Sequence, residues 1–253
     1  MLDADKRAIG AAFGAAASHY DKAAALQRLI AERLLGMTPP GLTGSLLDAG
    51  CGTGYGLSAL HSAHPDAEVF GMDLATGMLQ QVRPHPTLGG DIERLPIADQ
   101  SLALYWSSLA WQWTQPERAI SEAARALATG GFLRVATLGP DTLRELNEAF
   151  ASADDHRHTR QFPDEDSYPE WLSAAGFDAI HIERRRFVAH AATLRDIIEN
   201  LRTLGAHVIG DGRRQGLMSR AAWRRVDDAY EAQREAAGLP YTYDAIFLCA
   251  TRA

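Results

Sequence analysis

Short apolar runs alternate with helix-forming segments over the first 140 residues of the chain. The apolar runs predict five strands, at 45–49, 68–72, 87–91, 102–107 and 132–137. The segments between them predict helices at 55–64, 76–83 and 116–127, and Gly130-Gly131 is expected to end the last one. Strands that alternate with helices predict a parallel sheet covered on both faces, so we expect an α/β fold of the doubly wound, Rossmann-like kind.

Both ends of the chain carry further helices. The first 36 residues predict helix, which Pro39-Pro40-Gly41 stops. Beyond Pro140 the pattern predicts helices at 142–150, 167–175, 193–204 and 219–237, and strands at 179–188 and 241–251. Thr193 and Ser219 are the expected N-caps of the last two helices, and Gly205 is the expected residue beyond the first of them. This pair of helices interrupts the last two strands, so we expect it at the carboxyl edge of the sheet, shaping a substrate pocket.

We expect one structural domain built from three consecutive parts. An N-terminal helical segment (1–40) precedes a Rossmann-like ligand-binding core (41–140), and the rest of the sheet with its helical insertion follows (141–253). A length of 253 residues is ample for one large domain with a substantial core.

Composition narrows the classes of function. The chain has 32 acidic and 25 basic residues, a net charge of −7, which argues against nucleic acid as a general partner because such proteins need basic surface. No apolar run approaches the roughly 20 residues of a membrane span, and no signal peptide is expected. The only cysteines, Cys51 and Cys249, exclude a cysteine-built zinc site, and the histidines form no metal pattern. We therefore expect a cytoplasmic protein without a bound metal.

The glycine-rich segment Asp48–Gly54 carries the strongest chemical signal. It lies between a predicted strand and a predicted helix, which is the context of a nucleotide-binding turn. Its spacing is G-x-G-x-G, whereas a dinucleotide fold has G-x-G-x-x-G around a pyrophosphate. Asp48 stands two residues before Gly50, where a carboxylate would repel a phosphate and favour a cationic ligand such as a sulfonium or an amine.

Two further acids follow at the ends of the next two predicted strands. Asp73 can accept hydrogen bonds from both ribose hydroxyls, and Asp91 can accept from an adenine amino group. Three acids at successive strand ends indicate an adenosine ligand without a phosphate, and S-adenosylmethionine is that ligand. The alternative is that these are ordinary turn residues, since Asp and Gly are common in turns.

At these residues the chain resembles the class I S-adenosylmethionine-dependent methyltransferases, over about residues 41–138. It also resembles, over nearly its whole length, one branch of them: the malonyl-acyl-carrier-protein O-methyltransferases of biotin synthesis. The closer likeness is carried by Phe13–Asp21 with Leu26-Gln27-Arg28, Gly90–Pro96, Trp106–Trp113 and Leu201–Ala206. The resemblance implies a mostly parallel, seven-stranded sheet with an antiparallel C-terminal strand.

The resemblance also implies the residues of the cofactor site. From the methionine part to the adenine they are Asp48, Gly50, Cys51, Gly52 and Gly54, then Asp73, Leu74 and Met78, then Asp91 and Ile92, with Ser107 and Leu109 beside the sulfonium and Tyr20 closing over the ligand. The family often has Asn where this chain has Ser108 and Lys where it has Arg202, which concerns the substrate rather than the cofactor.

The implied reaction moves a methyl group from S-adenosylmethionine to the free carboxylate of malonyl-acyl-carrier protein or malonyl-CoA, leaving S-adenosylhomocysteine. This carboxylate is already an anion at pH 7. It needs no general base, and catalysis would rest on positioning. The expected positioning residues are Tyr20, Ser108, Gln112, Trp113, Arg160 and Arg202. Arg160 or Arg202 would hold the malonyl carboxylate, although either one can equally be a solvated surface arginine.

An acidic carrier protein would need a basic docking surface. Residues 176–226 contain ten arginines and five acids, so the rest of the chain carries −12. We expect docking on 176–226, with an ordinary solvated face as the alternative. Two other functions stay open: another small-molecule methyltransferase, such as a quinone C-methyltransferase or a small-acid O-methyltransferase, and a protein that keeps the cofactor fold without methylating.

Overall fold

The seven strands of the computed structural model form one mixed sheet in the order β3-β2-β1-β4-β5-β7-β6. The structure describes residues 4–154, 156, 158–204 and 218–253. β1 to β5 are parallel, and β7 is antiparallel to both of its neighbours, β5 and β6. The strands are β1 (Gly44–Ala49), β2 (Ala67–Asp73), β3 (Thr87–Gly89), β4 (Leu102–Ser108), β5 (Leu127–Leu138), β6 (Phe177–Ala191) and β7 (Leu239–Arg252). The expected seven-stranded sheet with an antiparallel C-terminal strand is confirmed.

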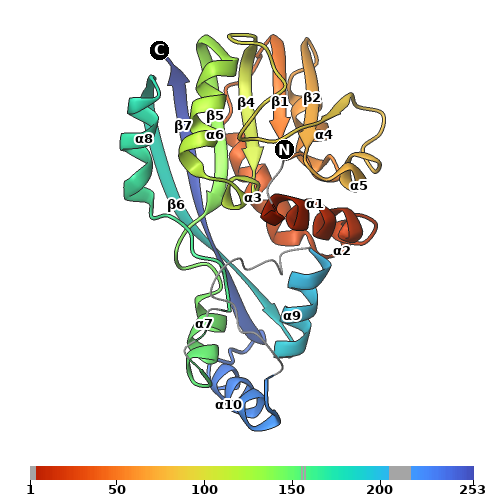
Figure 1. Ribbon diagram of the computed structural model, residues 1–253, viewed down its shortest axis with the longest axis vertical. Helices are drawn as coiled ribbons and strands as arrows, with labels where there is room; N and C mark the ends of the chain where they lie inside the picture. Colours follow the sequence, from red (N-terminus) through yellow and green to blue (C-terminus); the bar gives the residue numbers. More distant parts are fainter. Residues whose placement is uncertain (1–3, 155, 157, 205–217) are drawn as a thin grey trace.

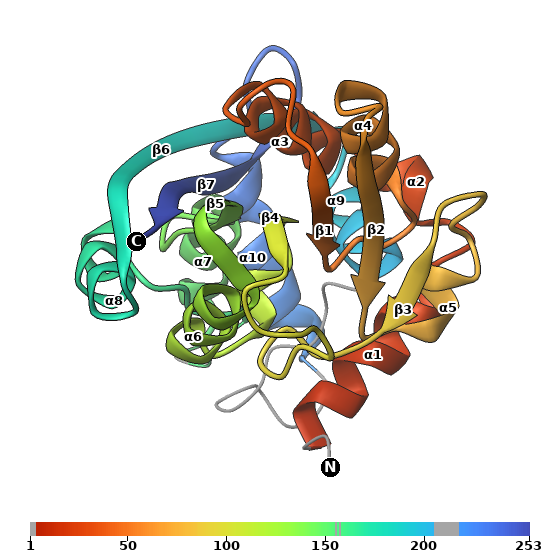
Figure 2. The same ribbon diagram turned by 90° about the horizontal axis from the view of Figure 1, so that it is seen from above.

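Helices cover both faces of this sheet. Figure 2 shows α3 and α4 on one face and α6 with α8 on the other. Leu34 and Leu57 are fully buried on the first face, and Ile120 and Leu172 are buried on the second. The helices are α1 (Ala4–Ala16), α2 (Tyr20–Ala23), α3 (Ala25–Gly36), α4 (Tyr55–Ala63), α5 (Thr76–Leu79), α6 (Pro116–Ala126), α7 (Arg144–Ala151), α8 (Tyr168–Ala174), α9 (Leu194–Thr203) and α10 (Arg220–Glu231). Within the described residues, none of these helices has the length and hydrophobicity to span a membrane.

Helices α1 and α2 lie at the carboxyl edge of the sheet, below the ends of β1, β2 and β4 in Figure 1, whereas α3 lies on one face of the sheet. α1 packs so closely on α5 that a Cβ on Gly77 would lie 2.8 Å from the carbonyl oxygen of Gly14. Only glycine allows two backbones to approach to this distance. Helix α1 of the N-terminal segment therefore packs closely against the core. The segment forms three helices, α1 to α3, rather than one.

One predicted helix end is wrong. α6 ends at Ala126, and β5 begins directly at Leu127 because Leu127 pairs with Leu102 of β4. Gly130 and Gly131 consequently lie inside the long strand β5. A Cβ on Gly131 would lie 2.8 Å from the carbonyl oxygen of Ala128. Glycine is therefore needed there because two backbone segments approach closely, and it does not cap the helix.

Three other elements are shorter than predicted. The strand expected over 87–91 ends at Gly89, so Asp91 lies beyond it, in a bridge to Arg94. The helix expected over 76–83 ends at Leu79. The helix expected over 219–237 ends at Glu231, because the chain turns at Glu235–Gly238 before β7 begins.

α9 and α10 form a separate layer with α7 around the far ends of β6 and β7 (Figure 1). The N-cap predictions are confirmed: Thr193 and Asp196 form a capping box, and the Ser219 hydroxyl accepts from the backbone N–H of Ala222 at 3.1 Å. Gly205 lies outside the described residues. Buried side chains of all three helices form a small core of their own, which includes Phe150, Ile197 and Tyr230. The insertion thus stands at the carboxyl edge of the sheet, as expected.

Candidate active site

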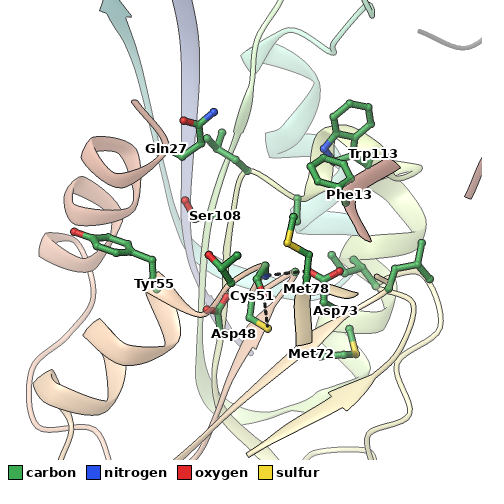
Figure 3. Close-up of a pocket in the computed structure, with 18 of the residues that line it drawn as sticks. Phe13, Gln27, Asp48, Cys51, Tyr55, Met72, Asp73, Met78, Ser108 and Trp113 are labelled. Carbon is green, nitrogen blue, oxygen red and sulfur yellow. Dashed lines mark hydrogen bonds between the residues drawn. The ribbon is translucent and has the colours of Figure 1, made fainter. Parts of the chain in front are cut away.

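A cleft opens at the carboxyl edge of the sheet, between the ends of β1, β2 and β4 and the helices α1 to α3 (Figure 3). The space within it amounts to about 1090 Å³, which includes the open solvent at its mouth. Most residues expected at the site line this cleft: Tyr20, Asp48, Gly50, Cys51, Gly52, Asp73, Leu74, Met78, Asp91, Ile92, Ser108, Leu109 and Trp113. Others that were expected lie outside its lining: Gly54, Ser107, Gln112, Arg160 and Arg202.

The glycine turn shapes the floor of the cleft. Gly50 and Gly52 have φ angles of 81° and 53°, in the region that favours glycine. A Cβ on Gly50 would collide with the side chain of Ala110, whereas a Cβ on Gly52 would meet no atom within 4 Å. The backbone of Gly52 therefore borders open space in which a ligand fits. Gly54, with a φ of 92°, turns the chain into α4.

Asp48 presents a buried carboxylate to the cleft. The residue is 1% exposed, and among the described residues neither carboxylate oxygen has a hydrogen-bond partner of normal geometry. Burial, followed by the charge of Asp73, raises the pKa of Asp48 to about 8, and the backbone N–H of Leu57 has a smaller opposite effect. Burying a carboxylate without a partner is costly. The site therefore favours a cationic group beside Asp48.

Asp73 is held at the end of β2 by two backbone groups. Its carboxylate accepts from the N–H of Gly52 at 2.9 Å and from the N–H of Ala75 at 2.7 Å. Burial raises the pKa of Asp73, and these hydrogen bonds oppose that rise. Each carboxylate oxygen has a second lone pair. Asp73 can therefore still accept from two neighbouring hydroxyls.

Asp91 has a cationic partner that the sequence analysis missed. Nζ of Lys6, in α1, lies 2.7 and 2.6 Å from the two carboxylate oxygens of Asp91, and 3.0 Å from Glu93. The ion pairs join the N-terminal helix to the segment that follows β3. An adenine amino group at Asp91 would share this carboxylate with Lys6.

The loop after β4 is shaped by side chains that point away from the cleft. Leu109 has a φ of 54°, and Nε2 of Gln112 donates to its carbonyl oxygen at 2.6 Å. The hydroxyl of Ser107 donates to the carbonyl oxygen of Ala49 at 2.6 Å, which fixes β4 to β1. Gln112 and Ser107 thus support the loop, while Ser108 and Leu109 line the cleft.

An aromatic group closes one side of the cleft. Trp113 packs edge-on against Phe13 of α1, with ring centres 5.3 Å apart, and Phe13 also contacts Tyr20 of α2. Burial, followed by the charge of Asp73, raises the pKa of the Tyr20 hydroxyl, which therefore stays protonated. Figure 3 shows Phe13 and Trp113 on the side of the cleft opposite Gln27 and Tyr55.

The two arginines expected to hold a carboxylate lie in different places. The guanidinium of Arg160 lies 5.5 Å from the centre of the Trp113 ring, so it stands directly behind a wall of the cleft. Arg160 makes no hydrogen bond or ion pair with the part of the chain that the structure describes, and burial lowers its pKa. Arg202 is exposed on α9, in a separate groove with Ala12, Ala15 and Trp223. The structure therefore brings Arg160, and not Arg202, next to the cleft.

Several lining residues had no expected role. They include Lys6, Ile9 and Phe13 of α1, Gln27 and Arg28 of α3, Thr53 of the glycine turn, and Tyr55 and Gly56 at the start of α4. Of these eight, Phe13, Gln27 and Arg28 fell within stretches that carried the family resemblance. No local pattern marks these residues, because they reach the cleft only when α1 and α3 pack beside the glycine turn.

The residues of the cleft fit S-adenosylmethionine. A buried carboxylate without a partner suits its cationic groups, and the open space beside Gly52 admits a chain close to the backbone. Asp73 retains acceptors for a ribose. Bound there, this ligand would supply an electrophilic methyl group on a sulfonium.

Comparisons with known proteins agree with this geometry. Residues 47–135 match the family described as "Methyltransferase domain". The chain is 45% identical over 248 residues to a malonyl-[acyl-carrier protein] O-methyltransferase of Dechloromonas aromatica, which covers 98% of this chain and 95% of that protein. It is 37% identical over 251 residues to the biotin biosynthesis bifunctional protein BioHC of Cellvibrio japonicus, which covers 96% of this chain and 50% of that protein.

The fold has counterparts among solved structures. A SAM-dependent methyltransferase of Thermotoga maritima is similar with a TM-score of 0.60 over 97% of this chain and 100% of that chain. The sequence identity is 16%, so this likeness concerns the fold alone.

Proposed function

The chain belongs to the malonyl-[acyl-carrier protein] O-methyltransferase family, and from this we propose that it methylates the free carboxylate of a malonyl group on acyl-carrier protein or coenzyme A. The products are the malonyl methyl ester, as a starter for pimeloyl and biotin synthesis, and S-adenosylhomocysteine. The observation that carries this proposal is the similarity over 98% of the chain, which includes both the cleft and the helical layer beside it.

The proposed cofactor contacts follow the order of the strands. Asp48 and the glycine turn (Gly50, Cys51, Gly52, Gly54) hold the methionyl part, Asp73 holds the ribose with Leu74 and Met78 beside it, and Asp91 with Ile92 meets the adenine. Ser107 and Leu109 were expected beside the sulfonium. Because the Ser107 hydroxyl is used on Ala49, we propose that Ser108 and Leu109 fill that place.

The acceptor needs positioning rather than deprotonation. A malonyl carboxylate is ionised at pH 7, and orienting two reactants can lower a barrier by several kcal/mol. Tyr20, Ser108 and Trp113 line the cleft, and Gln112 fixes the loop that carries two of them. We propose that these residues orient the carboxylate toward the methyl group while Tyr20 keeps water out.

We propose Arg160 as the cation that holds the malonyl carboxylate. Changing Arg160 to Ala should lower kcat/KM for malonyl-CoA about 30-fold, the effect of losing one charge-assisted hydrogen bond. The dissociation constant of S-adenosylhomocysteine, measured by calorimetry, should stay within about threefold, because Arg160 lies over the Trp113 ring and is not among the residues that line the cofactor cleft.

Arg202→Ala is the matched control for this prediction. Arg202 is exposed outside the cleft, so its loss should change kcat/KM for malonyl-CoA by less than about twofold. Equal kcat/KM values for the Arg160→Ala variant and the unaltered protein would contradict the assignment.

Some of the arginines in the basic region 176–226 already form ion pairs within the protein, so fewer of them can contact a docking partner than the sequence indicates. Arg184 is bound to Asp244, Arg186 lies 2.5 Å from Asp141, and Arg213 and Arg214 lie outside the described residues. The exposed arginines of α9 and α10 are Arg195, Arg202, Arg220, Arg224 and Arg225. We propose that an acidic carrier protein docks on this α9–α10 surface.

Salt should weaken this docking. Between about 50 and 300 mM salt, kcat/KM for malonyl-acyl-carrier protein should fall about tenfold, because screening removes long-range attraction. With malonyl-pantetheine, which lacks the protein, kcat/KM should change little. The double variant Arg195→Ala/Arg224→Ala should have a flatter salt profile, whereas Arg118→Ala on α6 should keep the original one. A flat profile for the unaltered protein would remove the docking proposal.

One assay separates the proposed function from its alternatives. The protein is incubated with S-adenosylmethionine and malonyl-acyl-carrier protein, malonyl-CoA or acetyl-acyl-carrier protein, and the methyl ester and S-adenosylhomocysteine are measured. Both products should form with the malonyl substrates only, because acetyl has no free carboxylate. Turnover only on other small acids or quinones would indicate a different methyltransferase, and cofactor binding without S-adenosylhomocysteine would indicate a protein that does not methylate.

A further inference from the structure

A second pocket lies outside the cofactor cleft, between helix α7 and the segment 154–162. Amide and hydroxyl side chains share its lining with aromatic rings; the lining includes Asn147, Phe150, Thr159, Arg160, Gln161 and Phe162. Apart from Arg160, none of the described residues that line it has a role in the proposed reaction. Polar groups spaced over apolar surface are typical of small-molecule sites. The pocket therefore suits a chain that carries both amide and hydrocarbon groups.

The walls of this pocket are fixed by contacts within the protein. The His158 ring stacks on Phe150 of α7 with ring centres 3.9 Å apart, and its Nε2 lies 2.8 Å from Oδ1 of Asp154. The Thr159 hydroxyl, which is almost fully buried, donates to Oδ1 of Asn147. The segment that carries Arg160 is thus anchored to α7 before a ligand binds. A preformed wall lowers the cost of ordering on binding.

The amide side chains of the pocket have unused hydrogen-bonding groups. Within the described residues, Asn147 binds Thr159 through its oxygen, and neither its amide nitrogen nor the side chain of Gln161 makes a hydrogen bond. A carboxamide offers two N–H donors and an acceptor oxygen, and a hydroxyl that donates can still accept. Asn147, Thr159 and Gln161 can therefore bind both the N–H and the C=O groups of amides in a ligand.

The pocket adjoins both the cleft and the proposed docking surface. Arg160, which lines the pocket, lies over the ring of Trp113, which lines the cleft. On the other side α7 ends beside α10, where Arg225 donates to the carbonyl oxygens of Ser152 and Ala153 at 3.3 and 3.2 Å. Figure 1 shows α7 and α10 next to each other. A ligand in this pocket would thus extend from the wall of the cleft toward α10.

We propose that the pocket between α7 and the segment 154–162 binds the pantetheine arm of the acceptor, with the amides of the arm on Asn147 and Gln161. The inference takes the acceptor and the role of Arg160 from the proposed function. A malonyl group is short, so when its carboxylate lies at Arg160 the thioester and the arm lie just beyond it. The arm is a hydrocarbon chain interrupted by amides, which matches the lining of the pocket.

Kinetics with paired acceptors test this assignment. Malonyl-pantetheine has the whole arm, and the S-methyl thioester of malonate keeps the carboxylate and the thioester without it. The unaltered protein should have a kcat/KM at least about tenfold higher for malonyl-pantetheine. Gln161→Ala should raise KM for malonyl-pantetheine about fivefold, the effect of losing one neutral hydrogen bond. Its kcat, and its kcat/KM for the S-methyl thioester, should stay within about twofold.

Filling the pocket provides a second test. Ala151 lines the pocket at the exposed end of α7, so Ala151→Trp should exclude the arm and raise KM for malonyl-pantetheine at least about tenfold, while the S-methyl thioester reacts as before. The matched controls are Glu148→Trp, exposed on the same helix, and Gln81→Ala, exposed after α5. Neither residue lines the pocket or the cleft, so both variants should behave like the unaltered protein.

The outcomes separate this inference from the proposed function. Equal losses on the two acceptors would show that the variants only displace Arg160, and no loss on either would show that the arm lies elsewhere; both results would overturn the inference. Thermal unfolding shows whether Ala151→Trp keeps the fold, and the exposed Gln161→Ala decides if it does not. Failure of the unaltered protein to methylate either acceptor would remove the proposed function itself. Equal kcat/KM values of the unaltered protein for the two acceptors would remove only the inference.

Discussion

Replacing Asp48 with Asn should abolish tight binding of S-adenosylmethionine, with a dissociation constant raised at least about 100-fold. Asp48 is the buried acid of the cleft, without a hydrogen-bond partner of normal geometry among the described residues. In a site of low dielectric, loss of the counter-charge of a buried cation costs several kcal/mol, and each 1.4 kcal/mol is about tenfold in affinity. Calorimetry with S-adenosylmethionine measures the loss. Asp66→Asn, at an exposed turn before β2, should bind normally.

The same substitution should stabilise the protein without ligand at alkaline pH. The pKa of Asp48 is raised from its ordinary value of 3.8 to about 8 in the fold, so its contribution to stability is complete below about pH 4 and is lost as the pH rises through about 8. Asn has no charge to bury, although its unpaired amide costs about 1–3 kcal/mol. The free energy of unfolding at pH 9 should therefore rise by on the order of 2 kcal/mol.

Urea unfolding between pH 5 and 9 measures this effect. The difference between Asp48→Asn and the unaltered protein should grow with pH, and Asp66→Asn should show no such trend. Normal cofactor affinity in Asp48→Asn, or a stability difference that shrinks toward pH 9, would contradict the role given to this carboxylate.

Removing Arg184 should destabilise the whole fold by about 3–5 kcal/mol, the usual cost of leaving a buried charge without its partner. Asp244 of β7 is 0% exposed, and Nε and Nη2 of Arg184 lie 2.9 and 2.8 Å from its carboxylate oxygens. These hydrogen bonds raise the pKa of Arg184, so it stays charged. The same carboxylate accepts from the backbone N–H of Asp141, just after β5. The pair therefore joins β6 and β7 to the loop that leads into α7.

Urea unfolding of Arg184→Met tests this prediction. Arg186→Met, two residues along the same strand, removes a half-exposed ion pair with Asp141 and should cost less than about 1 kcal/mol. The double variant Arg184→Met/Asp244→Asn should be more stable than Arg184→Met alone, because it carries no buried charge. Equal stability of the two single variants would show that the buried pair contributes nothing.

The sequence predicted the architecture well because its signals are local. The N-caps of α9 and α10 depend on one side chain and one helical turn, and the structure confirms both. Gly130 and Gly131 misled the prediction because a glycine after a helical pattern has two meanings. Only the pairing of Leu127 with Leu102 decides between a helix end and a close strand contact.

The acidic residues of the candidate site could be predicted from the sequence, whereas the positions of its cationic residues could not. Asp48, Asp73 and Asp91 lie at or near the ends of predicted strands, and parallel strands bring their carboxyl ends to one edge. Lys6 meets Asp91 across 85 residues of sequence, and no spacing rule links them. Arg160 lies beside the cleft and Arg202 lies in another groove, although both were equal candidates from sequence.

By itself, the sequence determined the alternation of strands and helices in a doubly wound sheet, the glycine turn and the three acids at its edge. Periodicity, turn chemistry and strand ends are properties of short segments, and parallel strands bring their carboxyl ends to one edge of the sheet. Only the tertiary structure decided which arginines are available. Arg184 is used in a buried pair, Arg202 faces solvent and Arg28 faces the cleft, because a long cationic side chain takes its partner from segments distant in sequence.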